Sequence, residues 1–345
     1  MAEGPEVAVI VGAYRRERFL RSALRSVLDQ TLPRERYEIL VTKDFANDEI
    51  DHFLKEQRIP ALLDDDPRIG SWLGRAVAAT RAPYLAFLDD DDEFEPDRLS
   101  HALEVLHADP GLGFYRNRVR VIDENGAPVP REAWRFYAVD DYLDRRGPVT
   151  VPPRDKAGLA ELGLEKTRVS FNSSTMIVRR ELLEGELGAV FARTQLPDVA
   201  LFVLAALSRF GLYLDDRRLT RYRSYPGKVT HRVPWLRHAC EAYRDLSSLA
   251  RAHQNDDFAR RLVRTSEHYD RVYRTGTIVE KVGAGAKRRE VAQLAMEYLR
   301  FLGQHPAERA FALDVWAAEL YAASYLLAPG VTRRVSVRQE ARRRP

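Results

Sequence analysis

Residues Tyr84–Asp92 read Tyr-Leu-Ala-Phe-Leu-Asp-Asp-Asp-Asp, a short apolar run that ends in four aspartates. An apolar run of this length is typical of a strand that is buried on both faces of a parallel sheet. The aspartates then follow the carboxyl end of that strand, which is where open parallel sheets bind their ligands. The stretch therefore predicts a buried strand and, directly after it, a binding site.

The flanking sequence predicts that this strand belongs to an alternation of strands and helices. Apolar residues recur at helical spacing between Phe19 and Leu28 and between Gly70 and Thr80. Three earlier apolar runs predict strands: Val7–Val11, Tyr37–Thr42 and Ile59–Leu63. Such alternation is typical of an α/β protein with a mostly parallel sheet, flanking helices and right-handed crossovers.

The pattern changes in the middle of the chain. Gly113–Ile122 alternates in polarity and predicts an edge strand. Val169–Val178 and Leu212–Tyr222 predict two more strands, with a helix at Val199–Phe210 between them. From Trp235 onward the apolar residues follow a helical period almost throughout, so a helical region is expected to end the chain.

The strand and helix pattern predicts that the chain has two parts. Residues 1–232 form the large domain, with a nucleotide-binding half at about 1–110 and an acceptor half at about 111–232. Residues 233–345 form a C-terminal helical extension with a basic tail, Arg333–Pro345. This extension is expected to pack on the large domain or on a second copy of the chain, which makes a homodimer an open alternative.

Composition limits the classes of partner. The 55 basic and 51 acidic side chains leave a net charge of only +4, so nucleic acid is not an expected partner. The single cysteine, Cys240, and the lack of a signal peptide indicate a cytoplasmic protein. No run reaches the roughly 20 apolar residues of a membrane span, although the arginine-rich tail is a candidate contact with anionic lipid at the inner face of the membrane.

The aspartate run also suggests a chemistry. Consecutive carboxylates oppose one another's ionisation, and a divalent cation with oxygen ligands, Mg²⁺ or Mn²⁺, relieves that repulsion. Such a cation would leave positions open for a diphosphate. The alternative is a solvated loop that opens the helix expected at Pro96–Leu106, since carboxylates are also favoured at a helix N-terminus. The loops after Val7–Val11 and Tyr37–Thr42 fall at the same sheet edge, and this favours the binding site.

The sequence resembles the inverting glycosyltransferases of family 2, which have the Rossmann-like GT-A fold, over roughly residues 6–232. The most specific match is the strand with its acidic end and the Pro-Asp-Arg-Leu that follows it. The other matching segments are Val7–Arg16, Ser26–Thr31, Tyr37–Val41, Pro197–Asp198, Leu219–Arg223 and His231.

The resemblance implies roles for individual residues. Ala13, Tyr14 and Arg15 would line the base and ribose pocket, with Lys43 and Asp44 beside it. Arg75 would lie near the diphosphate, and Asp89 and Asp90 near the ribose and sugar. Asp91 would be the main metal ligand and Asp198 the catalytic base. Arg223 and His231 would belong to a late segment that closes over the diphosphate, with His231 as a second metal ligand.

Two departures from the family pattern bear on these roles. The family commonly has two aspartates, glycine and serine after the second strand, where this chain has Lys43-Asp44-Phe45-Ala46. This departure leaves UDP, GDP and dTDP donors open. The residue before Asp198 is Pro197 and not the usual glutamate. Because aspartate also favours helix starts, Asp198 has a structural alternative to catalysis.

The function expected from the resemblance is metal-dependent transfer of a sugar from a nucleotide-diphosphate sugar to a hydroxyl of a glycan or lipid-linked acceptor, with inversion. One alternative is a catalytically degenerate sugar-nucleotide-binding or scaffold protein, which Lys43 and Pro197 suggest. Another is a Mg²⁺-dependent phosphatase of the haloacid dehalogenase type, which also has an Asp-x-Asp motif at a strand end. That class carries the motif on its first strand, whereas here it follows the fourth.

Overall fold

The computed structural model describes residues 4–14, 17–66, 68–130, 147–154, 156, 159, 169–225 and 233–304. In these residues the strands are β1 Val7–Ala13, β2 Tyr37–Lys43, β3 Ala61–Leu63, β4 Tyr84–Asp89, β5 Glu93–Phe94, β6 Leu112–Ile122, β7 Val149–Val151, β8 Met176–Arg179 and β9 Gly211–Arg223. The α-helices are α1 Glu17–Leu28, α2 Asp48–Glu56, α3 Ile69–Ala79, α4 Arg98–Ala108, α6 Gly185–Phe191, α7 Pro197–Leu207, α8 Val233–Ala252, α9 Asp256–Gly283 and α10 Arg288–Gln304. The strands form one sheet in the order β3-β2-β1-β4-β8-β6-β9-β5, and β7 also pairs with β9.

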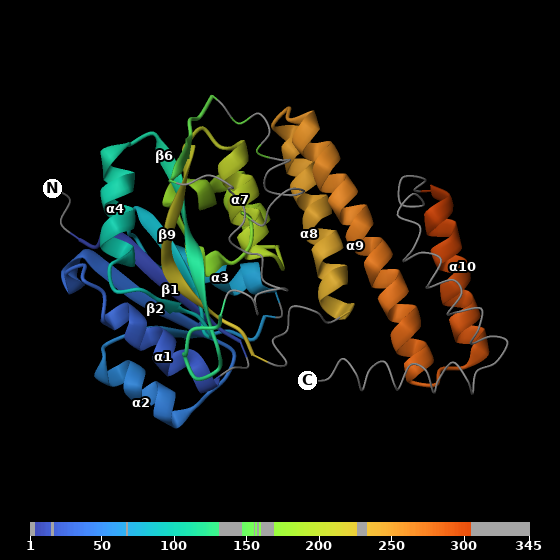
Figure 1. The fold of residues 1–345 in the computed structure, drawn as a ribbon, viewed down its shortest axis with the longest axis horizontal. Helices are drawn as coiled ribbons and strands as arrows, with labels where there is room; N and C mark the ends of the chain where they lie inside the picture. Colours follow the sequence, from blue (N-terminus) through green and yellow to red (C-terminus); the bar gives the residue numbers. More distant parts are fainter. Residues whose placement is uncertain are drawn as a thin grey trace. The chain divides into compact units, whose positions relative to one another are not determined.

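The N-terminal half of the sheet is parallel, as predicted. Strand β1 runs parallel to β2 on one side and to β4 on the other, and β3 extends the sheet beyond β2. Alternate residues of β1, beginning with Val7 and Val9, pack into a core with α1, α2 and α4. Helix α3 covers the other face, and Figure 1 shows it across the sheet from α1 and α2. Gly12 suits this packing because a Cβ there would come within 2.7 Å of the Trp72 ring of α3.

The second half of the sheet is mixed. Strand β8 runs antiparallel to β4 and β6, and β9 runs parallel to β6. The prediction that Gly113–Ile122 forms an edge strand was wrong, because β6 lies between β8 and β9. Its polar residues do not mark a solvent face: Arg116 and Asn117 are both fully buried. The polar side chains at these positions therefore form hydrogen bonds inside the protein and do not indicate contact with water.

The strand predicted at Val169–Val178 is shorter in the structure. A 3₁₀ turn occupies Ser173–Thr175, and β8 begins only at Met176. The residue before the turn, Asn172, has a φ of 67°, in the left-handed region that L-residues rarely adopt. That backbone conformation interrupts an extended chain, so the apolar pattern alone could not place the break.

The chain divides into two compact units. One comprises Met1–Tyr225 with Asp245–Arg261, and the other comprises Pro226–Arg244 with Leu262–Pro345. The boundary predicted at residue 232 falls at the end of 226–232, which lies outside the described residues, and stays a prediction. The basic tail also lies outside them. In the part of the chain that the structure describes, no helix is both long enough and apolar enough to span a bilayer.

The second unit has a small core of its own. Ile278 and Val282 of α9 pack with residues of α10 that include Tyr298 and Phe301. On α10, Met296 is 53% exposed and Leu299 is 47% exposed. The apolar stripe expected on α10 is thus partly buried within the unit and partly exposed.

Candidate active site

The carboxyl ends of the parallel strands meet at one edge of the sheet. Gly12 of β1 lies opposite Thr42 of β2 and Asp89 of β4. Three of the predicted segments consequently begin at the same level of the sheet: Ala13–Tyr14, Lys43–Asp44 and Asp89–Asp92. Arg15 and His231, which were predicted to join them, lie outside the described residues.

Asp90 connects the end of β4 to the end of β1. Its backbone N–H donates to the carbonyl oxygen of Gly12 at 3.1 Å. Its carboxylate Oδ2 accepts from the backbone N–H of Tyr14 at 3.2 Å. Because Asp90 is fully buried, these bonds fix the loop that was predicted to carry the base and ribose pocket.

Asp92 is enclosed by donors from distant parts of the chain. Its Oδ2 accepts from Asn172 Nδ2 and from Ser174 Oγ, both at 2.8 Å. Its Oδ1 accepts from the backbone N–H of Arg223 at 3.0 Å. These donors hold the Asp92 carboxylate at a fixed position inside the protein.

Asp91 and Asp89 provide two further carboxylates near that of Asp92. Tyr225 donates its hydroxyl to Asp91 Oδ2 at 2.9 Å, and the Asp91 side chain is fully buried. Asp89 is only partly buried, and its Oδ1 accepts from Ser173 Oγ at 3.2 Å. One carboxylate oxygen from each of Asp89, Asp91 and Asp92 falls within 4.8 Å of the others.

This donor set fits a hard divalent cation. Three convergent carboxylate oxygens suit Mg²⁺ or Mn²⁺, which prefer oxygen ligands. Among the described residues, Asp89, Asp91 and Asp92 are the group of metal-ligating side chains that meets this criterion.

Arg223 lies beneath the cluster and is 2% exposed. Its Nε donates to the carbonyl oxygen of Asp91 at 2.9 Å, and its Nη2 forms an ion pair with Glu93. The guanidinium also stacks 4.7 Å from the ring centroid of Phe19. In this structure Arg223 therefore holds the acidic strand end in place, and its contact with a diphosphate stays a prediction.

Asp198 is the second residue of α7, after Pro197. Its Oδ2 accepts from the backbone N–H of Asn172 at 3.0 Å, and its Oδ1 accepts from its neighbour Val199 at 2.9 Å. Burial raises the pKa of Asp198, which the hydrogen bonds and the nearby Arg116 partly oppose. A carboxylate with a raised pKa is better suited to accept a proton near neutral pH.

Two basic residues of the predicted site are engaged in local contacts. Lys43 is 6% exposed; its Nζ donates to the Phe45 carbonyl oxygen at 2.6 Å and pairs with Asp51 at 2.8 Å. Arg75 forms a bidentate ion pair with Asp64. Their contacts with a nucleotide remain predictions, as does that of Asp44, which is partly buried.

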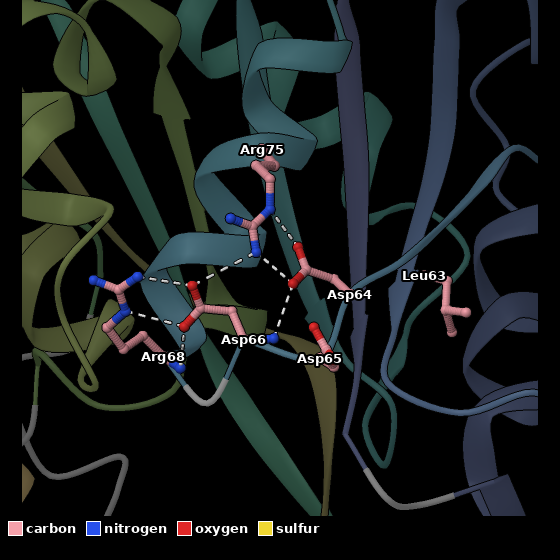
Figure 2. A pocket seen from close by; sticks show the side chains of 6 residues that line it. All are labelled: Leu63, Asp64, Asp65, Asp66, Arg68 and Arg75. Carbon is pink, nitrogen blue, oxygen red and sulfur yellow. Dashed lines mark hydrogen bonds and ion pairs between the residues drawn. The ribbon is translucent and has the colours of Figure 1, made fainter.

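Arg75 also lines a pocket of about 650 Å³ at the end of β3 and the start of α3 (Figure 2). The lining is a second acidic run with two arginines and an apolar residue: Leu63, Asp64, Asp65, Asp66, Arg68 and Arg75. Arg68 pairs with Asp66 at 2.8 Å, as the dashed lines show. No role was predicted for this run from the sequence, although its three consecutive aspartates are visible there.

Three residues that hydrogen-bond to the cluster were not predicted from the sequence: Asn172, Ser174 and Tyr225. Two fully buried arginines, Arg98 and Arg116, were not predicted either. Arg98 donates to Asn117 Oδ1 at 3.1 Å and to the Met176 carbonyl oxygen at 3.3 Å, and burial lowers its pKa to about 9. Arg98 falls in the Pro-Asp-Arg-Leu match, whereas no local signal indicates that Tyr225 reaches Asp91 from 134 residues away.

Asn172 thus links the acidic strand end of the mixed sheet to a separate carboxylate, that of Asp198. The chain belongs to glycosyl transferase family 2, whose model matches residues 8–184, a little over half of its length. It is similar to EpsH of Bacillus subtilis, a protein named as a glycosyltransferase, with 28% identity over 108 residues, which are 30% of this chain and 31% of that one. Chondroitin synthase of Escherichia coli is 27% identical over 127 residues, 35% of this chain and 18% of the relative. The chain thus spans a third or less of the length of both relatives.

Solved structures show the same fold. TarS 1-349 of S. aureus in complex with UDP-GlcNAc superposes with a TM-score of 0.58 at 16% identity, covering 98% of this chain and 92% of that one. The mannosyltransferase PcManGT of Pyrobaculum calidifontis, in complex with GDP-Man and Mn²⁺, gives a TM-score of 0.50 at 15% identity, covering 95% and 88%. The predicted GT-A fold is therefore confirmed, and family membership decides against a phosphatase.

Proposed function

We propose that this chain transfers a sugar from a nucleoside-diphosphate sugar to an acceptor hydroxyl in glycan synthesis, with inversion at the anomeric carbon. The observation that carries the proposal is that Asn172 is hydrogen-bonded both to Asp198 and to Asp92, a member of the cluster of Asp89, Asp91 and Asp92. A base and a metal-binding cluster joined through one residue suit a single in-line displacement.

Asp89 and Asp91 would hold Mn²⁺ or Mg²⁺ in this proposal, with Asp92 as their anchor and His231 as a further ligand. The bound ion would supply Lewis-acid stabilisation of the departing diphosphate. The presence of Mn²⁺ and GDP-Man in the PcManGT complex supports this assignment. The oxygen-only character of the described ligand set supports it independently.

Asp198 would accept the proton of the attacking hydroxyl. Its raised pKa favours that step because a base whose pKa lies nearer the working pH takes up the proton more readily. The residue as a whole is only partly buried, at the start of α7. The glutamate usual before it is absent, and Pro197 instead starts the helix in the conformation that proline prefers.

The donor would lie along the strand ends. Ala13, Tyr14 and Asp44 remain the proposed base and ribose contacts, with Arg15 and Lys43 beside them. Asp89 and Asp90 would lie near the ribose and sugar, and Arg75 and Arg223 near the diphosphate. A nucleoside-diphosphate donor is favoured because the two structural neighbours bind UDP-GlcNAc and GDP-Man. The acceptor would be a glycan or a lipid-linked saccharide, and association with a membrane surface or a second copy of the chain stays a proposal.

Donor screening followed by product analysis tests the function. UDP-, GDP-, dTDP- and CDP-sugars are each incubated with the protein, with and without Mn²⁺, and release of the nucleoside diphosphate is measured. A metal-dependent release with one donor is expected, and NMR of the product should show the inverted anomer. A retained configuration would contradict the mechanism, and binding of a nucleotide without any turnover would favour the sugar-nucleotide-binding alternative.

Asp198→Asn tests the base. The substitution should lower kcat by about 100- to 10,000-fold, the usual contribution of a general base, and leave nucleotide affinity unchanged. Asp256→Asn is the matched control, since Asp256 is an exposed aspartate in the first turn of α9. Retained turnover in the Asp198 variant would mean that this residue only begins its helix.

A further inference from the structure

Asn172 occupies an unusual position between the two sides of the proposed site. It is 4% exposed and precedes the 3₁₀ turn that leads into β8. Its φ of 67° places it in the left-handed region, where non-glycine residues are uncommon and where functional sites often hold strained backbone. Asparagine is one of the residues that tolerates this conformation.

The side chain of Asn172 reaches the acidic cluster. Its Nδ2 donates to Asp92 Oδ2 at 2.8 Å, while its Oδ1 accepts from the backbone N–H of Ser174 at 2.8 Å. The second bond fixes the amide orientation, so that the NH₂ group faces the carboxylate. Asp92 itself adjoins Asp91, which makes this contact a support for the proposed metal ligand.

The backbone of the same residue reaches the proposed base. The Asn172 N–H donates to Asp198 Oδ2 at 3.0 Å. This N–H belongs to the peptide group whose carbonyl oxygen, that of Phe171, accepts from Arg116 Nη2 at 3.2 Å. The guanidinium thus holds one end of the peptide group while the other end points at Asp198.

We propose that Asn172 is a positioning residue that fixes Asp198 relative to the acidic cluster, one group through its backbone and the other through its side chain. This inference rests on the proposed function, because it gives Asp198 and the cluster opposite roles in one displacement. Each of the two carboxylates belongs to a different element, α7 or the end of β4, and Asn172 bonds to both. Alignment matters here because a displacement of about 1 Å can cost about 100-fold in rate.

A purely structural role for Asn172 would be to begin the 3₁₀ turn, and Asn172→Gly separates the two roles. Glycine adopts the left-handed conformation freely and keeps the N–H that faces Asp198. It removes both side-chain bonds, so the peptide group loses its tie to Asp92. Arg58→Gly is the matched control, because Arg58 is exposed and is also a non-glycine residue at positive φ, 53°.

Steady-state kinetics and a carboxyl titration test the inference together. In Asn172→Gly we expect kcat to fall by about 10- to 100-fold, with KM for the donor within about threefold, while the Arg58 control keeps both. We also expect the pKa of Asp198, followed by ¹³C NMR of aspartate-labelled protein and assigned with Asp198→Asn, to rise. The rise follows because a less well-held N–H stabilises the carboxylate less.

Three results would overturn the proposed role of Asn172. One is kcat within twofold of wild type with the Asp198 pKa unmoved. Another is a fall in melting temperature beyond that of the Arg58 control, with kcat and KM changed in parallel, which would show a structural role only. The third is an unmoved Asp198 pKa in a protein that has no turnover with any donor. If wild-type protein has no turnover, that result counts against the proposed function. The Asp198 titration then decides the role of Asn172 independently of turnover.

Discussion

Two runs of aspartate follow parallel strands of the same sheet, and they differ in almost every other respect. Asp64–Asp66 follows β3, lines an open pocket and pairs with the half-exposed Arg68 and Arg75. Asp89–Asp92 follows β4, and Asp90, Asp91 and Asp92 are fully buried. The first run pairs with arginines a few residues away, whereas the second is held by residues from β9 and from the turn before β8.

The comparison shows that the surroundings of a carboxylate set its capacity for chemistry. Water reaches Asp65 and the two arginines of the first run, and ion pairs that water reaches contribute little to stability. The buried run lacks that contact with water, so its charges require donors at fixed positions. Fixed carboxylates can receive a cation without rearranging, and we therefore place the metal on the second run. Four predictions test this difference.

The largest expected effect is on turnover. Asp91→Asn should lower kcat by at least about 100-fold, since a bound metal supplies several kcal/mol to the departing diphosphate. Asp65→Asn, in the exposed run, should change it by less than about twofold. Nucleotide titrations with and without Mn²⁺ provide the second readout: the metal should strengthen binding in wild type and in Asp65→Asn only. Equal losses of kcat in Asp91→Asn and Asp65→Asn would contradict the difference between the two aspartate runs.

Stability should separate the arginines of the two runs. Arg223→Met removes the nearer of the two arginines that pair with Glu93 and the donor to the Asp91 carbonyl oxygen, which should cost about 3 kcal/mol. Arg68→Met breaks the pair between the half-exposed Arg68 and Asp66 and should cost much less. Urea unfolding of both variants measures the free energies. A cost for Arg68→Met as large as that for Arg223→Met would contradict the comparison.

The third effect concerns metal affinity. Tyr225→Phe removes the hydroxyl that donates to Asp91 Oδ2, and the ring itself stays packed 5.1 Å from that of Phe19. Loss of a hydrogen bond to a ligating carboxylate should weaken Mn²⁺ binding by about tenfold. Isothermal titration with Mn²⁺ in the presence of nucleoside diphosphate gives the affinity. An unchanged affinity would place the metal away from Asp91.

The smallest effect is the dependence of stability on pH, which should have opposite signs at two carboxylates. Burial raises the pKa of Asp198, so the native state keeps a proton that the unfolded state has already lost. Stability from this group therefore falls as pH rises from about 3.9 through the native pKa. Hydrogen bonds from Arg68 lower the pKa of Asp66, so its stabilisation is complete above about 3.9 and is lost as pH falls through the native value.

Urea midpoints measured between about pH 2 and pH 8 test these signs. Asp198→Asn should raise the midpoint at neutral pH relative to wild type, because no buried carboxylate then needs to ionise. Asp66→Asn should lower it, because the ion pair with Arg68 is lost. Shifts in the same direction for both variants would mean that their surroundings do not differ as the structure indicates.

Much of the fold was readable from periodicity. The apolar runs at Val7, Tyr37 and Tyr84 predicted β1, β2 and β4, because strands buried on both faces need continuous apolar residues. The placement of Asp89–Asp92 at a strand end followed directly from this. β6 was misplaced at the edge of the sheet, because its buried polar residues resemble those of a solvent-facing strand, and the break at Asn172 depends on a backbone angle that no apolar pattern records.

The sequence by itself determined the alternation of strands and helices, the acidic strand end and the resemblance to family 2, since these depend on neighbours along the chain. Only the tertiary structure decided which aspartates are buried and that Asn172, Tyr225 and Arg223 converge on them from 80 to 134 residues away. It also decided that Lys43 and Arg75 pair locally with Asp51 and Asp64. The physical reason is that desolvation and hydrogen bonding act between groups that are close in space, whatever their separation along the chain.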